Sequence, residues 1–326
     1  MARFSILKPL NVDEKFKICL DAINFFSALS NEEMCKKLAI KPEENKTYPL
    51  SDFDFLRYLK KTKILPDAQR YHHSIVTLLK KMEQVGILES AGKRRSTNCY
   101  YFTKELTEKQ RRSLIWLTPA IGADFLKYLL SPCIVQITGK IGEDIHAGSG
   151  IFISRTIILT CSHVLDDMKI DEVQLINGQE TRIVNFKSHP KIDVGFIEIE
   201  HSFDYAETQV VFAEPKILDE IYVMGFPKIP FTREAVLIIQ KGEVNSTNTT
   251  ALDGSNVFFF SAVARPGNSG GPIVSSDGYI VGIVSKDFSS ANETALPFYA
   301  GVSTSEIIKA LQEIDENIIL PIENYE

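Results

Sequence analysis

The chain has 326 residues, 44% of them hydrophobic and 24% charged, a length and composition that suit a globular protein of two domains. No apolar run reaches the roughly 18 residues of a membrane span. The first 26 residues mix charged and apolar side chains and lack the apolar core of a signal peptide. The five cysteines are widely spaced without a C-x-x-C pair, which argues against a disulfide framework and against a zinc site. We therefore expect a cytoplasmic protein with free thiols, no metal, no cofactor and no membrane contact.

Charge is distributed unevenly along the chain. The net charge is −6, but residues 1–112 carry 22 Lys and Arg against 14 Asp and Glu, a balance of +8, and the remainder carries −14. This asymmetry indicates two units with different partners, and an anionic partner suits the basic unit.

Residues 1–112 are predicted to form a mainly helical domain that ends in a hairpin. Helical spacing of apolar residues predicts helices over residues 13–28, 31–39, 53–61 and 68–86. Ser30, with Glu33 completing a capping box, and Asp67 are the expected N-caps of the second and fourth helices. Two short β runs, 87–89 and 99–103, then flank the basic turn 92–95, which is typical of a β-hairpin.

The order of helices followed by a hairpin with a basic tip resembles a winged helix-turn-helix domain. The similarity is strongest over Ser74–Thr103, where a last helix runs into the hairpin. The resemblance implies a nucleic-acid module whose last helix enters the major groove while Lys93, Arg94 and Arg95 contact phosphates. A module that docks an activating protein, with these charges on a solvated face, explains the pattern equally well.

After this domain the pattern changes twice. Residues 113–130 carry apolar side chains at helical spacing and are not Gly/Ser-rich, so we expect a helical connector that packs. From residue 131 onwards, short apolar runs alternate with turn residues, which predicts an all-β barrel or sandwich, closed by one helix over 303–314. The expected organisation is therefore multidomain: 1–112, 113–130 and 131–326.

The segment Pro266–Pro272 surrounds Ser269 with three glycines and two prolines. Taken alone, it is also compatible with an ordinary turn between two strands. A serine in such a turn suits acyl transfer, because the backbone N–H groups of Gly267 and Ser269 can stabilise an oxyanion. The required base and carboxylate are available, since His163 follows an apolar strand and Asp193 precedes another.

Five blocks of the second domain occur together in one known family: Gly148–Ile153, Leu159–Val164, Asp193–Ile197, Val223–Pro227 and Ser261–Pro272. They resemble the trypsin-like (chymotrypsin-fold) serine proteases, closest to the bacterial HtrA/Deg-like branch. The spacings of 30 residues from His163 to Asp193 and 76 to Ser269 also fit. The resemblance implies a β double barrel with a closing C-terminal helix, and a serine endopeptidase acting on protein substrates.

The resemblance also implies residue roles. Ser269 is the expected nucleophile, His163 the general base and Asp193 the carboxylate that orients it, in the order His–Asp–Ser. The N–H groups of Gly267 and Ser269 are the expected oxyanion hole. Asn268 replaces the aspartate that digestive trypsins pair with a freshly cut N-terminus, so we expect no activation by that cleavage. No PDZ module is expected after the closing helix.

Substrate preference follows from family position. Val263 is expected near the floor of the primary substrate pocket, with Ile283, Val284 and Ser285 along its edge. An apolar floor favours a small or apolar substrate side chain over Lys or Arg.

The remaining chemistry-bearing residues of this domain are expected to be structural. His146, His189 and His201 flank turns and are predicted to be polar loop residues, and Cys161 is predicted to be a buried small hydrophobe.

Three functional hypotheses remain open. The first is a regulated endopeptidase whose N-terminal domain senses or docks a partner. The second is a nucleic-acid-binding or partner-binding regulator in which the protease fold is a latent scaffold, against which the complete His–Asp–Ser set argues. The third is an enzyme that is inactive until a partner binds.

Overall fold

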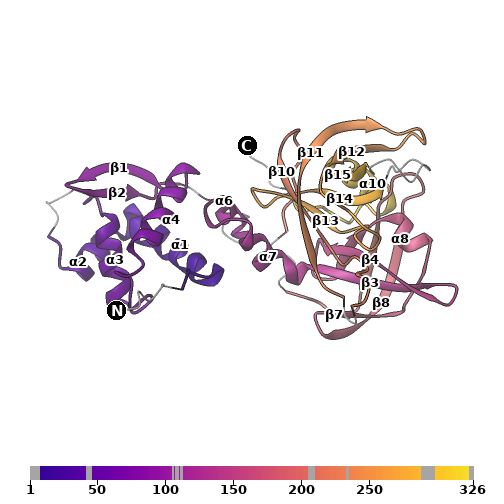
Figure 1. Ribbon diagram of the computed structural model, residues 1–326, viewed down its shortest axis with the longest axis horizontal. Helices are drawn as coiled ribbons and strands as arrows, with labels where there is room; N and C mark the ends of the chain where they lie inside the picture. The colour runs from indigo at the N-terminus through magenta and orange to yellow at the C-terminus, as the bar shows by residue number, and fades with distance from the viewer. Residues whose placement is uncertain are drawn as a thin grey trace, which may run out of the picture. The chain divides into compact units, whose positions relative to one another are not determined.

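The computed structural model describes residues 8–41, 46–104, 106, 110, 113–204, 210–232, 235–287 and 298–322. The chain forms two compact units (Figure 1). One comprises Met1–Thr107 and Leu117–Phe125, and the other Glu108–Trp116 and Leu126–Glu326. Residues of the expected connector 113–130 are thus divided between the units.

The N-terminal unit consists of helices followed by a hairpin. Its main elements are α1 (Val12–Phe26), α2 (Asn31–Leu38), α3 (Asp52–Lys61), α4 (His72–Gln84), β1 (Glu89–Arg94) and β2 (Thr97–Tyr101), with the short α6 (Thr118–Ile121). The segment before α3 pairs with the hairpin, because Tyr100 N donates to Leu50 O at 3.1 Å and Ser51 bridges Cys99. An isolated β-bridge therefore joins this segment to the two-stranded hairpin.

The predicted helix caps of this unit are only partly present. Ser30 lies at the N-cap position of α2, as predicted, but the capping box is absent, because the Ser30 hydroxyl donates to Asn24 O and Ser27 O instead. Asp67 does not cap α4, which begins at His72 because the intervening residues form successive turns. Capping boxes are present at Asn11 and Ser51, where α1 and α3 begin.

An aromatic cluster forms the core of the N-terminal unit. Phe25, Phe26, Phe55, Tyr58 and Tyr100 are all buried, with ring centroids 4.9–6.2 Å apart between the contacting pairs. Each such ring removes a large apolar area from water. The cluster joins α1 and α3 to the hairpin, so these elements are held as one body.

The C-terminal unit contains two β-structures. The first is a seven-stranded sheet in the order β6-β3-β4-β5-β9-β8-β7, and its strands are β3 (Ile134–Ile141), β4 (Asp144–Phe152), β5 (Ile157–Thr160), β6 (Lys169–Ile170), β7 (Val173–Ile176), β8 (Gln179–Ser188) and β9 (Gly195–Ile199). The second is a closed barrel in the order β10-β11-β12-β15-β14-β13, and its strands are β10 (Glu220–Gly225), β11 (Ile238–Thr250), β12 (Asn256–Phe260), β13 (Pro272–Ser275), β14 (Ile280–Asp287) and β15 (Tyr299–Ser303).

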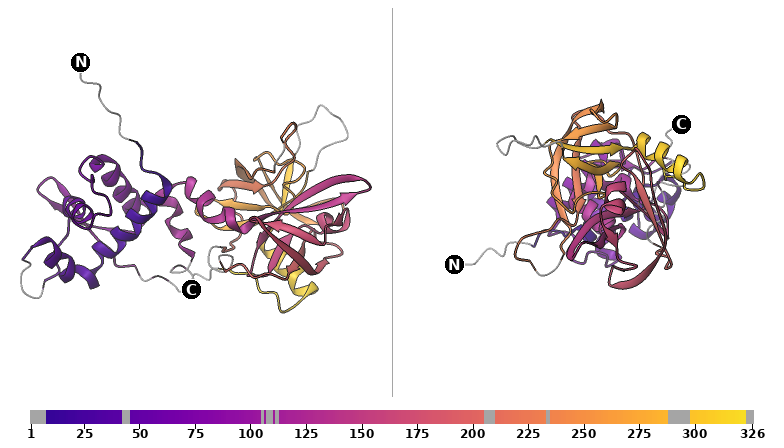
Figure 2. Two further views of the ribbon diagram at one scale, coloured as in Figure 1. Left: turned by 90° about the horizontal axis from the view of Figure 1, so that it is seen from below. Right: turned by 90° about the vertical axis from the view of Figure 1, so that its right-hand side faces the viewer.

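Helices border these strands. Helix α7 (Asp124–Leu130) precedes β3, α8 (Ser162–Asp166) follows β5, and α10 (Thr304–Ile314), yellow in Figure 2, packs beside β14 and β15. The expected fold class, a mainly helical N-terminal domain and a β double barrel with a closing helix, is confirmed. Among the described helices, none has the length and apolar composition of a membrane span.

Alternation along the strands fills the closed barrel. Ile221 and Val223 of β10, and Phe258 and Phe260 of β12, point to one face two residues apart and are buried together. A hydrogen bond from Ser149 N to Ser269 O, 2.8 Å long, then joins β4 of the first sheet to the turn before β13. The segment that carries Ser269 is thereby held between the two β-structures.

Candidate active site

The turn before Ser269 has a defined backbone shape. Asn268 N donates to Arg265 O at 2.8 Å, Pro266 is the second residue of this turn, and Gly267, with φ of +99°, is the third. Proline followed by a positive-φ glycine is the pattern of a type II turn. Pro266 O accepts a hydrogen bond from Lys228 N at 3.2 Å. In a trans peptide the C=O and N–H groups point in opposite directions, so the Gly267 N–H points away from Lys228.

The N–H groups of Gly267 and Ser269 are free to bind a ligand. Within the described residues, neither N–H donates a hydrogen bond. Gly267 O, in contrast, accepts from Ser149 Oγ at 2.6 Å, and Ser149 Oγ itself accepts from Phe226 N at 2.9 Å. These bonds fix the turn from its outer side, so that two unoccupied donors remain beside Ser269.

Close packing determines the residue that follows the serine. Gly270 has φ of +79°, and a Cβ there would lie 2.2 Å from Thr160 Oγ1 and 2.3 Å from Ser149 O. Only glycine avoids both the strain and the overlap. Its N–H donates to Val284 O at 2.8 Å, which ties the turn to β14.

Asp193 and His163 form a hydrogen-bonded pair. His163 lies in the first turn of α8, directly after β5, and its Nδ1 is 2.9 Å from Asp193 Oδ1 and 2.8 Å from Oδ2. An ionised carboxylate only accepts hydrogen bonds, so Nδ1 carries the proton. Nε2 is therefore the unprotonated nitrogen of the neutral ring and is able to accept a proton.

Three further donors surround the Asp193 carboxylate. Ser162 Oγ lies 2.9 Å and His163 N 3.1 Å from Oδ1, and Ser285 Oγ lies 2.5 Å from Oδ2. Burial by itself raises the pKa of Asp193, but hydrogen bonding and Coulombic attraction to His163, together with the Ser285 hydroxyl, hold the pKa well below its usual range. Asp193 is thus an ionised acceptor at neutral pH, and its carboxylate orients the His163 ring.

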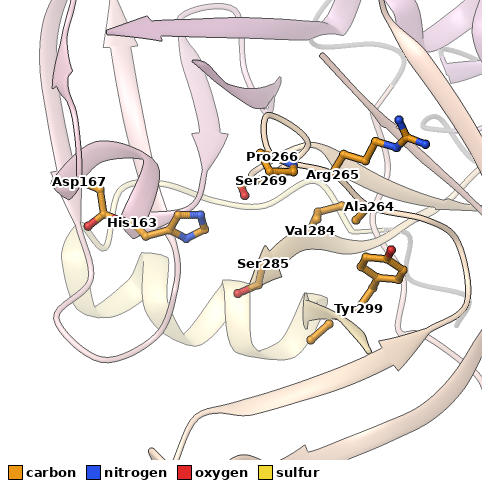
Figure 3. Close-up of a pocket in the computed structure, with 10 residues that line it drawn as sticks. His163, Asp167, Ala264, Arg265, Pro266, Ser269, Val284, Ser285 and Tyr299 are labelled. Atoms are coloured by element: carbon orange, nitrogen blue, oxygen red, sulfur yellow. The ribbon is translucent and has the colours of Figure 1, made fainter. Parts of the chain in front are cut away.

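Ser269 and His163 line one cavity of about 470 Å³ (Figure 3). Its other lining residues are Asp167, Ala264, Arg265, Pro266, Val284, Ser285, Tyr299 and Ala300. No hydrogen bond joins the Ser269 and His163 side chains in the described structure; without substrate, catalytic hydrogen bonds are often longer than in the complex. The cavity thus brings the Ser269 hydroxyl and the His163 ring to one space, next to the turn that contains Gly267.

The residues expected for the substrate pocket are not all at this cavity. Val284 and Ser285 line the cavity, but Val263 is 40% exposed and Ile283 is fully buried, and neither lines it. Ala264 lines it instead of Val263, together with Tyr299 and Ala300 of β15, which the sequence pattern did not single out.

Other contacts of the site were also missed from sequence. Ser162, beside His163, and Ser285 both donate to Asp193, and Ser149 holds the nucleophile turn. The sequence placed Ser285 at the pocket edge and Ser162 next to the candidate base, but it gave no sign of these hydrogen bonds. His189, expected to be a polar loop residue, is instead 5% exposed, because its ring fills the loop before Asp193.

The three basic residues of the hairpin do not share one environment. Arg94 bonds to Tyr48 and to the buried Asp54, and its guanidinium lies 4.8 Å from the centroid of the Tyr48 ring. It is therefore tied into the N-terminal unit, and its expected role as a phosphate contact is not supported. Lys93 and Arg95 are exposed.

One group of possible metal ligands lies at this site. The ligand atoms of Cys161, His163 and Asp193 lie within 4.8 Å of one another. The buried Cys161 Sγ is 3.0 Å from Val284 O, and His163 Nδ1 and the Asp193 carboxylate bond to each other. A metal would have to break these bonds, so the donors suit the His–Asp pair better than a metal centre.

Comparison with known proteins identifies the type of this domain. Residues 148–283 match the family model of the trypsin-like peptidase domain. The serine protease Do-like HtrA of Bacillus subtilis is 27% identical over 200 residues, 52% of this chain and 43% of that protein. The uncharacterised protein y4bJ of Sinorhizobium fredii is 30% identical over 145 residues, 42% of this chain and 21% of that protein. The chain thus spans less than half the length of these curated relatives.

Among solved structures, the serine endoprotease from Yersinia pestis is similar with a TM-score of 0.48 and 19% identity, over 66% of this chain and 69% of that one. An HtrA-type protease, AlgW with a tripeptide, has a TM-score of 0.48 and 19% identity, over 59% and 63% of the two chains.

Proposed function

We propose that the protein is a serine endopeptidase acting through an acyl-enzyme, and the match of residues 148–283 to the trypsin-like peptidase domain supports this proposal. The observation that carries the proposal is the charged Asp193 bonded to His163 Nδ1, with His163 and Ser269 lining the same cavity. No cofactor takes part in this chemistry.

The proposed reaction begins with attack of Ser269 Oγ on the scissile carbonyl carbon. His163 Nε2 takes the hydroxyl proton, and Asp193 stabilises the imidazolium that results. His163 then gives this proton to the leaving amine, and the acyl group stays on Ser269. Water, deprotonated by the same nitrogen, attacks the ester, releases the carboxylic acid product and restores the hydroxyl group.

The oxyanion of each tetrahedral intermediate is proposed to bind the N–H groups of Gly267 and Ser269. The argument is that neither donor has a partner and that the type II turn directs the Gly267 N–H away from Lys228. Donors of this kind contribute about 2.7–4 kcal/mol each to transition-state stabilisation.

A fluorophosphonate probe tests this proposal, because it reacts with an activated serine. We expect the full-length protein to be labelled, Ser269→Ala to be unlabelled, and the exposed control Ser261→Ala to be labelled as the wild type is. Labelling that survives in Ser269→Ala would refute the assignment of the nucleophile. An unlabelled wild-type protein that remains unlabelled with a candidate partner would favour the scaffold hypothesis.

We also propose that residues 1–112 form a winged-helix-like module through which a partner controls the peptidase. Support comes from the order of helices followed by a hairpin, from the β-bridge between Ser51 and Cys99, and from the exposed Lys93 and Arg95 near the tip of the hairpin. Binding of the full-length protein to duplex DNA separates the two possible partners. Affinity that falls steeply with salt and weakens in a Lys93→Ala/Arg95→Ala variant indicates nucleic acid, and no binding favours a protein partner.

Location in the cytoplasm is part of this proposal. All five cysteines are free and buried, as suits a compartment in which thiols stay reduced.

A further inference from the structure

The loop between β8 and β9, residues 189–194, places Asp193, and a buried histidine organises it. His189 is 5% exposed, and Val194 at the other end of the loop is fully buried, whereas the four residues between them are more accessible. The loop is closed by hydrogen bonds from His189 N to Val194 O, 2.8 Å long, and from Val194 N to Ile192 O, 2.7 Å long. A buried polar ring at this place needs partners, because an unsatisfied one would be costly.

The partners of the His189 ring define its protonation. Nδ1 accepts from Lys191 N at 3.1 Å and from Ile192 N at 2.9 Å, so it carries no proton. Nε2 then carries the proton and donates to Glu313 Oε2 at 2.8 Å, on α10. This hydrogen bond lowers the pKa of Glu313, so the acceptor is ionised and favours the same tautomer.

We propose that His189 is a positioning residue for the reaction: by binding the N–H groups of Lys191 and Ile192, it holds the loop so that Asp193 faces His163. The inference rests on the proposed function, because positioning matters only if Asp193 orients the base. His189 acts through Asp193 and lines no part of the cavity described above.

The bonding of Asp193 explains why its loop needs this support. The carboxylate meets donors from Ser162, His163 and Ser285, which belong to α8 and β14. A displacement of its own loop lengthens all of these bonds at once. Misplacement of a catalytic group by about 1 Å can lower the rate about 100-fold.

Two substitutions distinguish the contacts of Nδ1 with the loop from the contact of Nε2 with Glu313. In His189→Asn, the side-chain oxygen takes the position of Nδ1, and Asn readily accepts from the N–H two residues on. In His189→Gln, the longer amide reaches the position of Nε2 and Glu313 but does not serve the loop. We expect kcat of the Asn variant within about 3-fold of the wild type. We expect kcat of the Gln variant to fall about 10–100-fold, with KM changed less than about 2-fold.

Lys187→Ala is the matched control. Lys187 Nζ lies 3.4 Å from Asp315 Oδ2, an exposed ion pair that also links β8 to the end of α10 but does not touch the Asp193 loop. Such pairs contribute little, so kcat of this variant is expected to equal that of the wild type.

The measurements are kcat and KM on a peptide ester, the rate of fluorophosphonate labelling, and the melting temperature of each full-length variant. Equal kcat in His189→Gln and wild type overturns the inference, as does an equal loss in the Asn and Gln variants. An equal loss in Lys187→Ala and His189→Gln also overturns it, because it would assign the effect to the strand–helix linkage. A wild-type protein that is neither labelled nor active would refute the proposed function itself. A wild-type protein that is active, with kcat of the variants equal to its own, would refute only the role of His189.

Discussion

Replacement of Gly267 by alanine tests the proposed oxyanion hole most directly. At φ of +99° an L-residue is strained, at a cost of about 1–3 kcal/mol. The new Cβ would also lie 2.6 Å from Phe226 O and 3.0 Å from Pro227 Cα, both backbone atoms that cannot rotate away. The least costly relief is rotation of the Pro266–Gly267 peptide, which turns the residue-267 N–H out of the oxyanion site.

The expected effect is on the transition state. Loss of one oxyanion donor lowers kcat about 100–1000-fold, equivalent to about 2.7–4 kcal/mol. KM should change little, because the oxyanion forms only after attack. The assay is steady-state hydrolysis of a chromogenic peptide ester by the full-length protein, together with the rate of fluorophosphonate labelling and the melting temperature.

Gly178→Ala is the control for backbone strain. Gly178 lies in the turn between β7 and β8 with φ of +80°, and a Cβ there meets no described atom within 4 Å. This variant should lose a comparable conformational contribution to stability, about 1–2 kcal/mol, and keep its kcat. A folded Gly267→Ala variant with kcat within about 3-fold of the wild type would refute the oxyanion-hole assignment.

Four further outcomes are expected. Asp193→Asn should lower kcat by about 10⁴-fold, because the ring of the base loses its tautomer and orientation; a loss below about 10-fold would contradict this role. The pKa of Asp193 is lower in the folded protein than in the unfolded chain, where a carboxylate has a pKa of about 3.9. Ionised Asp193 therefore stabilises the fold above this unfolded pKa, and the stabilisation is lost as the pH falls towards the folded pKa. The free energy of unfolding of the wild type relative to Asp193→Asn should therefore fall below about pH 4 in urea titrations, and a pH-independent difference would refute the assigned charge. All five cysteines are buried, and burial raises the pKa of Cys19 and Cys133 to about 12. Ellman's reagent at pH 8 should therefore react rapidly with no thiol in the native protein and with five thiols in denaturant. Fast modification of the native protein would contradict this burial. Arg94→Ala removes the ion-pair partner of the buried Asp54 and should destabilise the N-terminal unit by about 1–3 kcal/mol. The control Lys93→Ala, at an exposed position, should not change stability in thermal unfolding of the full chain. Equal melting temperatures of the two variants would show that the Arg94–Asp54 pair adds no stability.

The sequence by itself determined the features that depend on neighbouring residues. Pro266 followed by Gly267 dictates a type II turn, since proline presets one φ and glycine accepts the other. Apolar runs before His163 and after Asp193 predicted the strands next to them, and the same pattern predicted an all-β barrel or sandwich. The double barrel was an implication of the family resemblance. The domain limits 1–112, 113–130 and 131–326 stay predictions.

Only the tertiary structure decided the contacts between distant parts of the chain. Ser149 reaches Gly267 across 118 positions and Ser285 reaches Asp193 across 92, because strand order and register bring these residues together. Predictions from local sequence were also wrong where a residue distant in the chain provides a partner. The sequence predicted that Arg94 is available to contact phosphate, but in the folded protein it binds the buried Asp54. Burial and long-range hydrogen bonding depend on how whole strands pack, and no local stretch of sequence contains that information.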